Sequence, residues 1–283
     1  MKVPYATILI TLIVVSSYLL VSGGQPYIKE YGKMYQYSTS QMNLQRGNIL
    51  GLVTYSFMHI GIKHLVLNTT ILILIGWIVE EKIGWKHTLA LFFITSILAG
   101  IAYSLTVTRG WVIGSSAGIA GLMVGAYLSN IKKALAALIT ITLVSTVLIL
   151  PLTDFTLAQM TTTKEKIVNE SKEKILELNT SIEKIEKEIE TKKEQGKNIT
   201  EEVKKMENLT SQLNQTKKIE EKAKIEKESI EQGKKTEEKT PPSNLIHLYG
   251  ALAGIAYMMV FKREAFEWFL KDMKKIKEKI KWH

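Results

Sequence analysis

Two side chains that could do covalent chemistry lie inside apolar stretches of this chain. Ser116 stands in the sequence Gly-Ser-Ser-Ala-Gly at residues 114–118, and His247 lies in the last apolar stretch, far downstream. Polar groups in a membrane segment are expensive unless they are paired or functional. A hydroxyl and an imidazole in the membrane suggest proteolysis there.

A second polar pair precedes them in the chain. His64 and Asn68 are four residues apart, so on a helix they project from one face, one turn removed from each other. Each is a candidate site residue because it lies in an apolar segment. The structural alternative is that Asn68 bonds a neighbouring helix and that His64 caps its helix near the membrane surface.

Six apolar segments would carry these residues. Crossing a bilayer takes about 20 apolar residues, at roughly 1.5 Å of rise per residue. The segments that meet or approach this length are 4–23, 60–79, 88–107, 112–130, 134–152 and 244–261. Lys2 ahead of an apolar run that ends in small residues is also typical of a signal peptide, but we expect an uncleaved first helix.

The basic residues predict the orientation of these helices. With an even number of spans both termini lie on one side, and the positive-inside rule places the more basic side in the cytoplasm. That side contains Lys132, Lys133 and the eight Lys and Arg residues of 262–283, a tail that contributes a net charge of +4 to the chain's +10. Such a tail fixes topology and touches anionic lipid headgroups. We expect no nucleic-acid partner.

Glycines mark the helices that we expect to pack together. The fourth segment contains Gly114, Gly118, Gly121 and Gly125. In the sixth segment, Gly250 and Gly254 follow His247 on one helical face. Glycine stripes let two helices approach closely, so their packing would bring His247 to the top of the fourth helix, where Ser116 lies. Helix association alone would also explain the glycines.

These motifs together resemble those of the rhomboid intramembrane serine proteases. The matching pieces, in the family's order, are His59 with His64 and Asn68, Gly76 and Glu80 ahead of Gly84, Gly-x-Ser at 114–116, and His247-x-x-Gly250-x-x-x-Gly254. They cover essentially all of the chain except residues 155–240. The resemblance implies an all-α membrane protein with a rhomboid-like bundle of six transmembrane helices.

The resemblance also implies a role for each motif residue. Ser116 corresponds to the nucleophile and His247 to the general base, a dyad without the acidic third member of soluble triads. The backbone N–H of Ser116 and the side chains of His64 and Asn68 correspond to the oxyanion hole. Ser115 points about 100° away around the helix and is expected to be a small packing residue.

Some positions depart from the family pattern. Ala117 follows the nucleophile where many rhomboids have glycine, and Ala120 stands where an aromatic residue often backs the histidine. The tryptophan-arginine pair common in the first loop is missing from residues 49–54. These departures leave the rate and the substrate range open.

The other classes of intramembrane protease lack their necessary residues here. A zinc site-2 protease needs His-Glu-x-x-His, whereas His59 and His64 are five apart with no glutamate between them. An aspartyl protease needs two buried aspartates, but Asp154 and Asp272 lie at or beyond segment ends. The chain has no cysteine, which excludes disulfides and thiolate metal sites. We therefore expect neither a metal nor a cofactor.

Residues from about 161 to 240 form a charged insert made almost entirely of Lys, Glu, Thr and Ile or Leu. Its first apolar positions, 168, 175, 178, 182, 185 and 189, are mostly three and four residues apart, as in a coiled-coil seam. Gly196 interrupts the pattern, and a second set follows at Ile199, Val203, Met206 and Leu213. We expect a helical hairpin with arms of up to about 45 Å, ended by Gly233 through Pro241-Pro242. A single charged helix or a disordered loop is the alternative.

An independent pattern places the insert outside the cell. Its asparagines each begin an Asn-x-Ser/Thr acceptor for N-glycosylation: Asn169, Asn179, Asn198, Asn208 and Asn214. We therefore expect a glycosylated insert on the outer side, where the active site of a rhomboid opens. The Lys/Glu/Ile-rich composition suggests the plasma membrane of a heat-loving archaeon, although a glycosylating eukaryote or bacterium also fits.

The sequence thus predicts an integral membrane protein of four parts. These are transmembrane helices one to five at 1–157, the extracytoplasmic coiled-coil hairpin at 158–240, the sixth transmembrane helix at 241–262, with Ser243 as its N-cap, and a cytoplasmic tail at 263–283. The predicted activity is serine endopeptidase cleavage of single-span membrane proteins in or near the outer half of the bilayer. We expect the hairpin to be able to bind a protein partner. A non-catalytic rhomboid-like adaptor or a structural membrane anchor is the alternative, but neither needs both Ser116 and His247.

Overall fold

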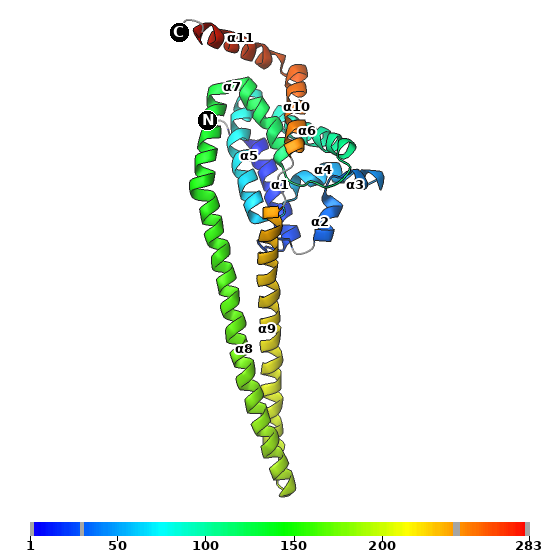
Figure 1. Ribbon diagram of the computed structural model, residues 1–283, viewed down its shortest axis with the longest axis vertical. Helices are drawn as coiled ribbons and strands as arrows, with labels where there is room; N and C mark the ends of the chain where they lie inside the picture. The colour runs from blue at the N-terminus through cyan, green and yellow to red at the C-terminus, as the bar shows by residue number, and fades with distance from the viewer. Residues whose placement is uncertain (1–2, 29–30, 240–243, 281–283) are drawn as a thin grey trace. The chain divides into compact units, whose positions relative to one another are not determined.

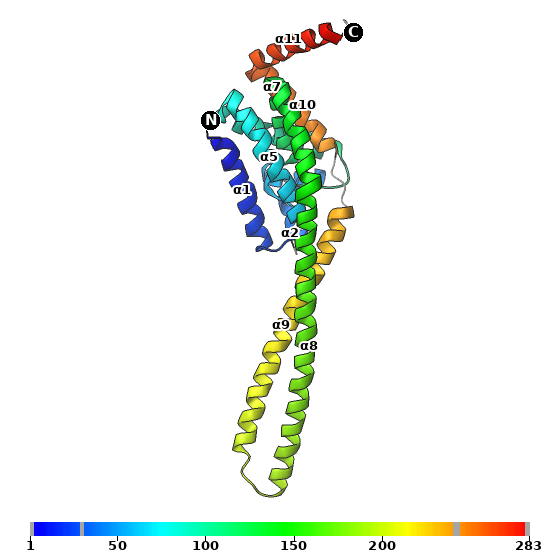
Figure 2. The ribbon, with the colours of Figure 1, turned by 90° about the vertical axis from the view of Figure 1, so that its left-hand side faces the viewer.

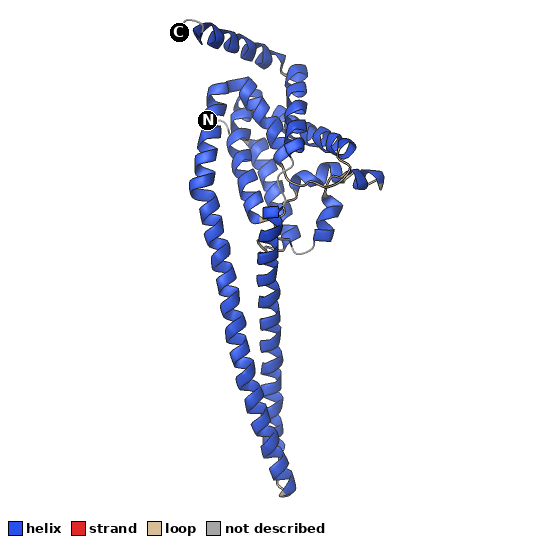
Figure 3. Cartoon of the chain, viewed as in Figure 1, coloured by secondary structure: helices blue, strands red, loops and turns tan. Residues whose placement is uncertain are grey.

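The computed structural model describes residues 3–28, 31–239 and 244–280. In this part of the chain the ordered structure is helical, and extended backbone pairs only in two isolated bridges, Tyr27 with Gly61 and Thr39 with Val112 (Figure 3). The elements in chain order (Figure 1) are α1 (Tyr5–Ser22), α2 (Tyr31–Tyr37), α3 (Gln41–Gln45), α4 (Gly51–Thr54), η1 (Tyr55–Phe57), α5 (Ile62–Ile83), α6 (Trp85–Thr106), α7 (Ser116–Val144), η2 (Ser145–Ile149), α8 (Leu150–Glu194), α9 (Thr200–Lys239), α10 (Asn244–Phe261) and α11 (Arg263–Ile280).

Five helical stretches of the described chain are long and apolar enough to cross a membrane. They are Tyr5–Ser22, Ile62–Ile83, Trp85–Thr106, the continuous stretch Ser116–Glu194, and Asn244–Phe261. Two of them begin later than their apolar runs predict. α5 starts only after Gly61, which is extended at φ −150°, and α7 starts after Gly114, whose φ of +119° favours glycine.

The fourth and fifth predicted segments fall in one helical stretch that has a break inside it. Asn130 has non-helical angles, φ −163° and ψ 83°. Its side-chain oxygen accepts a hydrogen bond from the backbone N–H of Lys133 at 3.1 Å, as a residue that caps the start of a helix does. The chain therefore begins a new helical segment after Asn130, and Figure 1 shows the ribbon of α7 turning back at the top of the view.

A π-helical stretch, η2, joins α7 to α8, and Pro151 is the second residue of α8. Proline has no N–H to donate to the carbonyl four residues before it, and its ring crowds that carbonyl. The regular α-helical pattern therefore changes just ahead of Pro151, and the wider turn keeps the helix continuous. The helical stretch therefore continues past the end of the predicted span 134–152 into α8.

Glu80 fixes the start of α1 against α5. Its carboxylate accepts hydrogen bonds from the backbone N–H groups of Ala6 at 3.0 Å and Thr7 at 2.9 Å, and from the Thr7 hydroxyl at 2.9 Å. The first amides of a helix have no acceptor within the helix, and they favour a negative charge. One turn earlier, a Cβ on Gly76 would lie 2.8 Å from the Thr7 hydroxyl oxygen, so glycine permits this close approach.

The chain forms two compact units, Met1–Thr153 with Gly233–His283, and Asp154–Gln232. In the second unit α8 and α9 are joined by ion pairs between the two helices: Lys164 with Glu226 at 2.6 Å, Lys227 with Glu165 at 3.3 Å, and Lys192 with Glu202. The apolar side chains of the predicted seam are buried or half-buried on both helices, among them Val168, Leu178, Ile189, Val203, Met206 and Leu213. The insert is therefore an ordered pair of helices rather than a disordered loop.

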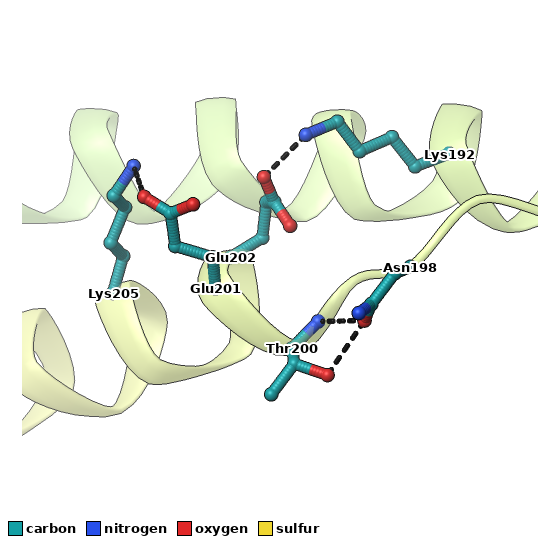
Figure 4. Close-up of polar contacts among 6 residues, drawn as sticks. All are labelled: Lys192, Asn198, Thr200, Glu201, Glu202 and Lys205. Atoms are coloured by element: carbon teal, nitrogen blue, oxygen red, sulfur yellow. Dashed lines mark hydrogen bonds and ion pairs between the residues drawn. The ribbon is translucent and has the colours of Figure 1, made fainter.

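The turn between α8 and α9 contains Gly196, whose φ is +64°. After it, the side-chain oxygen of Asn198 accepts hydrogen bonds from the Thr200 N–H at 2.9 Å and the Thr200 hydroxyl at 2.6 Å (Figure 4). The expectation that Gly233 ends the second helix is wrong, because α9 continues to Lys239. An interior glycine costs about 1 kcal/mol relative to alanine, which a long helix tolerates. Pro241, Pro242 and Ser243 lie outside the described residues.

Candidate active site

Gly114 and Tyr55 set the position at which α7 begins. The Gly114 N–H donates to the Tyr55 carbonyl at 2.8 Å, and the buried Tyr55 hydroxyl donates to the Ser96 carbonyl of α6 at 2.6 Å. A Cβ on Gly114 would lie 2.8 Å from Cε1 of His64, so only glycine fits beside this ring. Ser116 is then the first residue of α7, and it is half-buried.

The N-terminus of α7 presents hydrogen-bond donors beside Ser116. The Ser115 carbonyl accepts the first bond of the helix, from the Ile119 N–H at 3.0 Å. The amides of Ser116, Ala117 and Gly118 therefore have no acceptor within the helix. These groups carry the positive end of the helix dipole, so an oxyanion formed at Ser116 would be stabilised there.

Two glycines of α10 bring the turn that carries His247 to the same place. A Cβ on Gly250 would overlap the Ala117 carbonyl, and one on Gly254 would lie 2.9 Å from the Gly121 Cα. The two helices therefore touch through their backbones, with Gly250 next to the residue that follows Ser116. His247 is one turn before Gly250 and is half-buried. Ser116 and His247 are thus brought to one end of the α7–α10 contact.

Hydrogen bonds between side chains also hold α10 against α6. The hydroxyl groups of Tyr249 and Thr106 lie 2.8 Å apart. Nearer the other end of α10, the Tyr257 hydroxyl lies 2.9 Å from Nδ1 of His87. These bonds fix the rotation of α10 about its axis, and they thereby fix the direction in which His247 projects.

His59 lies at the centre of a buried polar cluster. It is fully buried, and its ring meets that of His64 edge to face, with the centroids 4.9 Å apart. The Asn68 side-chain nitrogen donates to Nε2 of His59 at 3.1 Å, and the Ser115 hydroxyl lies 3.4 Å from the same nitrogen. Burial lowers the pKa of His59 well below its usual range. The ring is therefore neutral, and its Nε2 serves as the acceptor.

Ser115 is more than the packing residue expected from the sequence. It is fully buried and its hydroxyl faces His59, whereas its neighbour Ser116 is half-buried. Neither Tyr55 nor the link between Ser115 and His59 was anticipated from the sequence. The one available signal was the polar residues within Tyr-Ser-Phe-Met-His at residues 55–59, shortly before α5.

Comparison with known proteins matches the part of the chain that holds this site. A family model described as the Rhomboid domain matches residues 46–170. This part of the chain is a rhomboid domain. The match includes His64, Asn68 and Ser116, and ends before His247.

Two curated relatives agree with this assignment. The chain is 33% identical to Rhomboid-related protein 3 of Homo sapiens over 132 residues, which are 45% of this chain and 32% of that protein. It is 28% identical to Rhomboid-like protease 2 of Toxoplasma gondii over 85 residues, which are 30% of each chain. The matches thus span about a third of the length of these relatives. No solved structure matches the chain significantly.

The glycines at the start of α7 and within it lie against three different neighbours. Gly114 lies beside His64, whereas Cβ atoms on Gly118 and Gly125 would meet α6 side chains, those of Phe92 and Leu91. Only Gly121 lies against α10, where it faces Gly254, and it also contacts Thr95 of α6. The glycine stripe expected to face α10 as a whole therefore faces mainly α6, because the narrow helix α7 is packed on both sides.

The candidate glycosylation residues are on the surface of the insert. All five asparagines are exposed: Asn169, Asn179, Asn198, Asn208 and Asn214. Of these, Asn198 lies in the turn and the others lie within α8 or α9. The same acceptor pattern at Asn68 falls on a buried residue, which leaves no room for a glycan.

Proposed function

We propose that this rhomboid is an intramembrane serine endopeptidase that cleaves single-span membrane proteins in or near the outer half of the bilayer. One arrangement carries the proposal. Ser116 is the first residue of α7 and is half-buried. Gly250 packs against Ala117, the residue that follows Ser116, and so holds the turn that contains His247 near it. The proposed nucleophile and the proposed base thus come from two distant parts of the chain.

The proposed reaction proceeds in two halves. The Ser116 hydroxyl attacks a peptide carbonyl while His247 takes its proton, and His247 then gives that proton to the leaving amine. The resulting acyl-enzyme is hydrolysed by water, which His247 activates in the same way. Because a helical backbone hides its carbonyls, the substrate helix must first unwind near the cleaved bond.

The proposed oxyanion hole combines the Ser116 N–H with the side chains of His64 and Asn68. An amide nitrogen has two N–H groups. One N–H of Asn68 is directed to His59 at 3.1 Å, which leaves the other for the oxyanion. Donors of this kind are each worth roughly 3 kcal/mol of transition-state stabilisation in a dry site. His59 would therefore orient Asn68 for catalysis.

We further propose six membrane passes for this chain: α1, α5, α6, the segments before and after Asn130, and α10. Both termini would then be cytoplasmic, and the insert of α8 and α9 would be a coiled coil on the outer side of an archaeal plasma membrane. The basic tail after α10 and the exposure of all five acceptor asparagines support this orientation. The insert is then free to bind a protein partner or a substrate.

Labelling by a serine-directed fluorophosphonate tests the proposed activity. We expect the purified wild-type protein to be labelled, Ser116→Ala to lose the label and His247→Ala to lose most of it. Ser129→Ala is the matched control, because it removes a hydroxyl from the same helix well away from the site and should label normally. Absence of labelling in the wild type, or equal labelling of all four proteins, would instead favour the non-catalytic adaptor.

A further inference from the structure

The helix that follows α10 has apolar side chains in two environments. α11 begins after a single non-helical residue, Lys262. Three of its apolar residues pack against the core of the membrane unit: Ala265, Phe266 and Phe269. Three others are exposed, at 46%, 52% and 41%: Trp268, Leu270 and Met273. The helix is therefore attached to the bundle but leaves a set of large apolar groups uncovered.

The direction of α11 places it along a membrane surface. It lies across the end of α10 in both views of the molecule (Figures 1 and 2). Because α10 is a candidate membrane span, a helix that crosses its end does not continue through the bilayer. A helix in this position buries its apolar side chains among the acyl chains and keeps its charges at the headgroups.

The charge of α11 identifies the kind of lipid that it fits. Arg263, Lys271 and Lys274 are exposed, and the sequence from 271 to 281 has six lysines against one aspartate and one glutamate. Cations next to exposed apolar groups match an anionic phospholipid leaflet. Trp268 is the residue type that is enriched at such interfaces.

We propose that α11 is an in-plane helix that binds the anionic phospholipid headgroups of the leaflet at this end of the bundle. Its contacts with α7 and α10 connect this surface to the helices that carry Ser116 and His247. Each basic residue near an anionic surface strengthens binding roughly fivefold, so reversing two of them weakens it by about 25-fold or more. This binding does not depend on the proposed protease activity.

The chain has no cysteine, so Leu270→Cys gives the full-length protein one site for a polarity-sensitive fluorophore. The labelled protein is reconstituted in vesicles of phosphatidylcholine alone and in vesicles that contain phosphatidylglycerol. We expect blue-shifted emission only with phosphatidylglycerol, and a return to the emission of a hydrated probe at high salt. The charge reversal K271E/K274E should abolish the shift, and K271R/K274R should retain it.

A matched charge reversal in the insert, K172E/K174E, should leave the shift unchanged, because those exposed lysines lie on another unit of the chain. The same emission in both kinds of vesicle, whether blue-shifted or not, overturns the proposal. So does a shift that is insensitive to K271E/K274E. A shift that disappears when the protein is diluted in lipid also overturns it, since a second copy of the chain would then cover this face.

Discussion

Replacing Gly250 with alanine should separate the two halves of the proposed site without unfolding the protein. The new Cβ would overlap the Ala117 carbonyl oxygen and lie 3.0 Å from its carbonyl carbon and 3.1 Å from its Cα. Ordinary van der Waals contact begins near 3.4 Å. The neighbour is backbone and cannot rotate away, so α10 must move outward by several tenths of an ångström up to about 1 Å. A displacement of this size at a catalytic group costs on the order of 10²-fold in rate.

The effect on stability should be much smaller than the effect on rate. Overpacking of this kind costs about 1–3 kcal/mol, but alanine in a helix interior gains about 1 kcal/mol over glycine. The variant should therefore remain folded, with a free energy of unfolding lowered by about 0–2 kcal/mol. The control is Ala256→Val, which enlarges an exposed residue of the same helix.

The assay compares the rate of fluorophosphonate labelling with thermal unfolding in the same detergent. We expect Gly250→Ala to label about a hundredfold more slowly at a nearly unchanged melting temperature, and Ala256→Val to label at the wild-type rate. A folded Gly250→Ala variant that reacts at the wild-type rate would refute the reasoning. His247 would then owe its position to something other than the backbone contact of α10 with α7.

Further predictions concern other parts of the chain. Glu80→Gln should lower the free energy of unfolding by about 1–3 kcal/mol, because the glutamine side chain lacks the negative charge that favours the backbone N–H groups at the start of α1. An unchanged melting temperature would show that this charge is dispensable. The bond from Lys192 holds the pKa of Glu202 below its ordinary value of 4.5, so its stabilising contribution is present above pH 4.5 and is lost as the pH falls through the lower folded-state pKa. Circular dichroism of the insert against pH should show this loss in the wild type, and Glu202→Gln should lack it. Asn198→Gln should reduce the mass of protein from a glycosylating host; a mass equal to that of the wild type after correction for the substitution would contradict glycosylation in the turn.

The sequence predicted most of the apolar helices because they depend on local patterns. Apolar runs of about 20 residues indicate spanning helices, and spacing alone placed Gly250 and Gly254 on the face of His247. The breaks were less predictable. Asn130 caps a new segment through its own side chain, whereas Gly233, a stronger breaker by residue type, lies inside α9. Which of two such residues ends a helix depends on tertiary contacts that spacing does not specify.

Ser115 and Ser116 have different contacts because Ser115 is the N-cap residue of α7 and Ser116 is its first residue. A serine at the N-cap position normally accepts a hydrogen bond from a first-turn amide, and this is worth about 1 kcal/mol. Ser115 is the N-cap residue of α7 but makes no such bond, because its hydroxyl faces His59 instead. The first-turn amides therefore stay available beside Ser116. The missing cap costs a little helix stability but leaves N–H donors where an oxyanion would form. The Ser115 hydroxyl also helps to satisfy Nε2 of the buried His59, the atom to which the Asn68 side chain is bound.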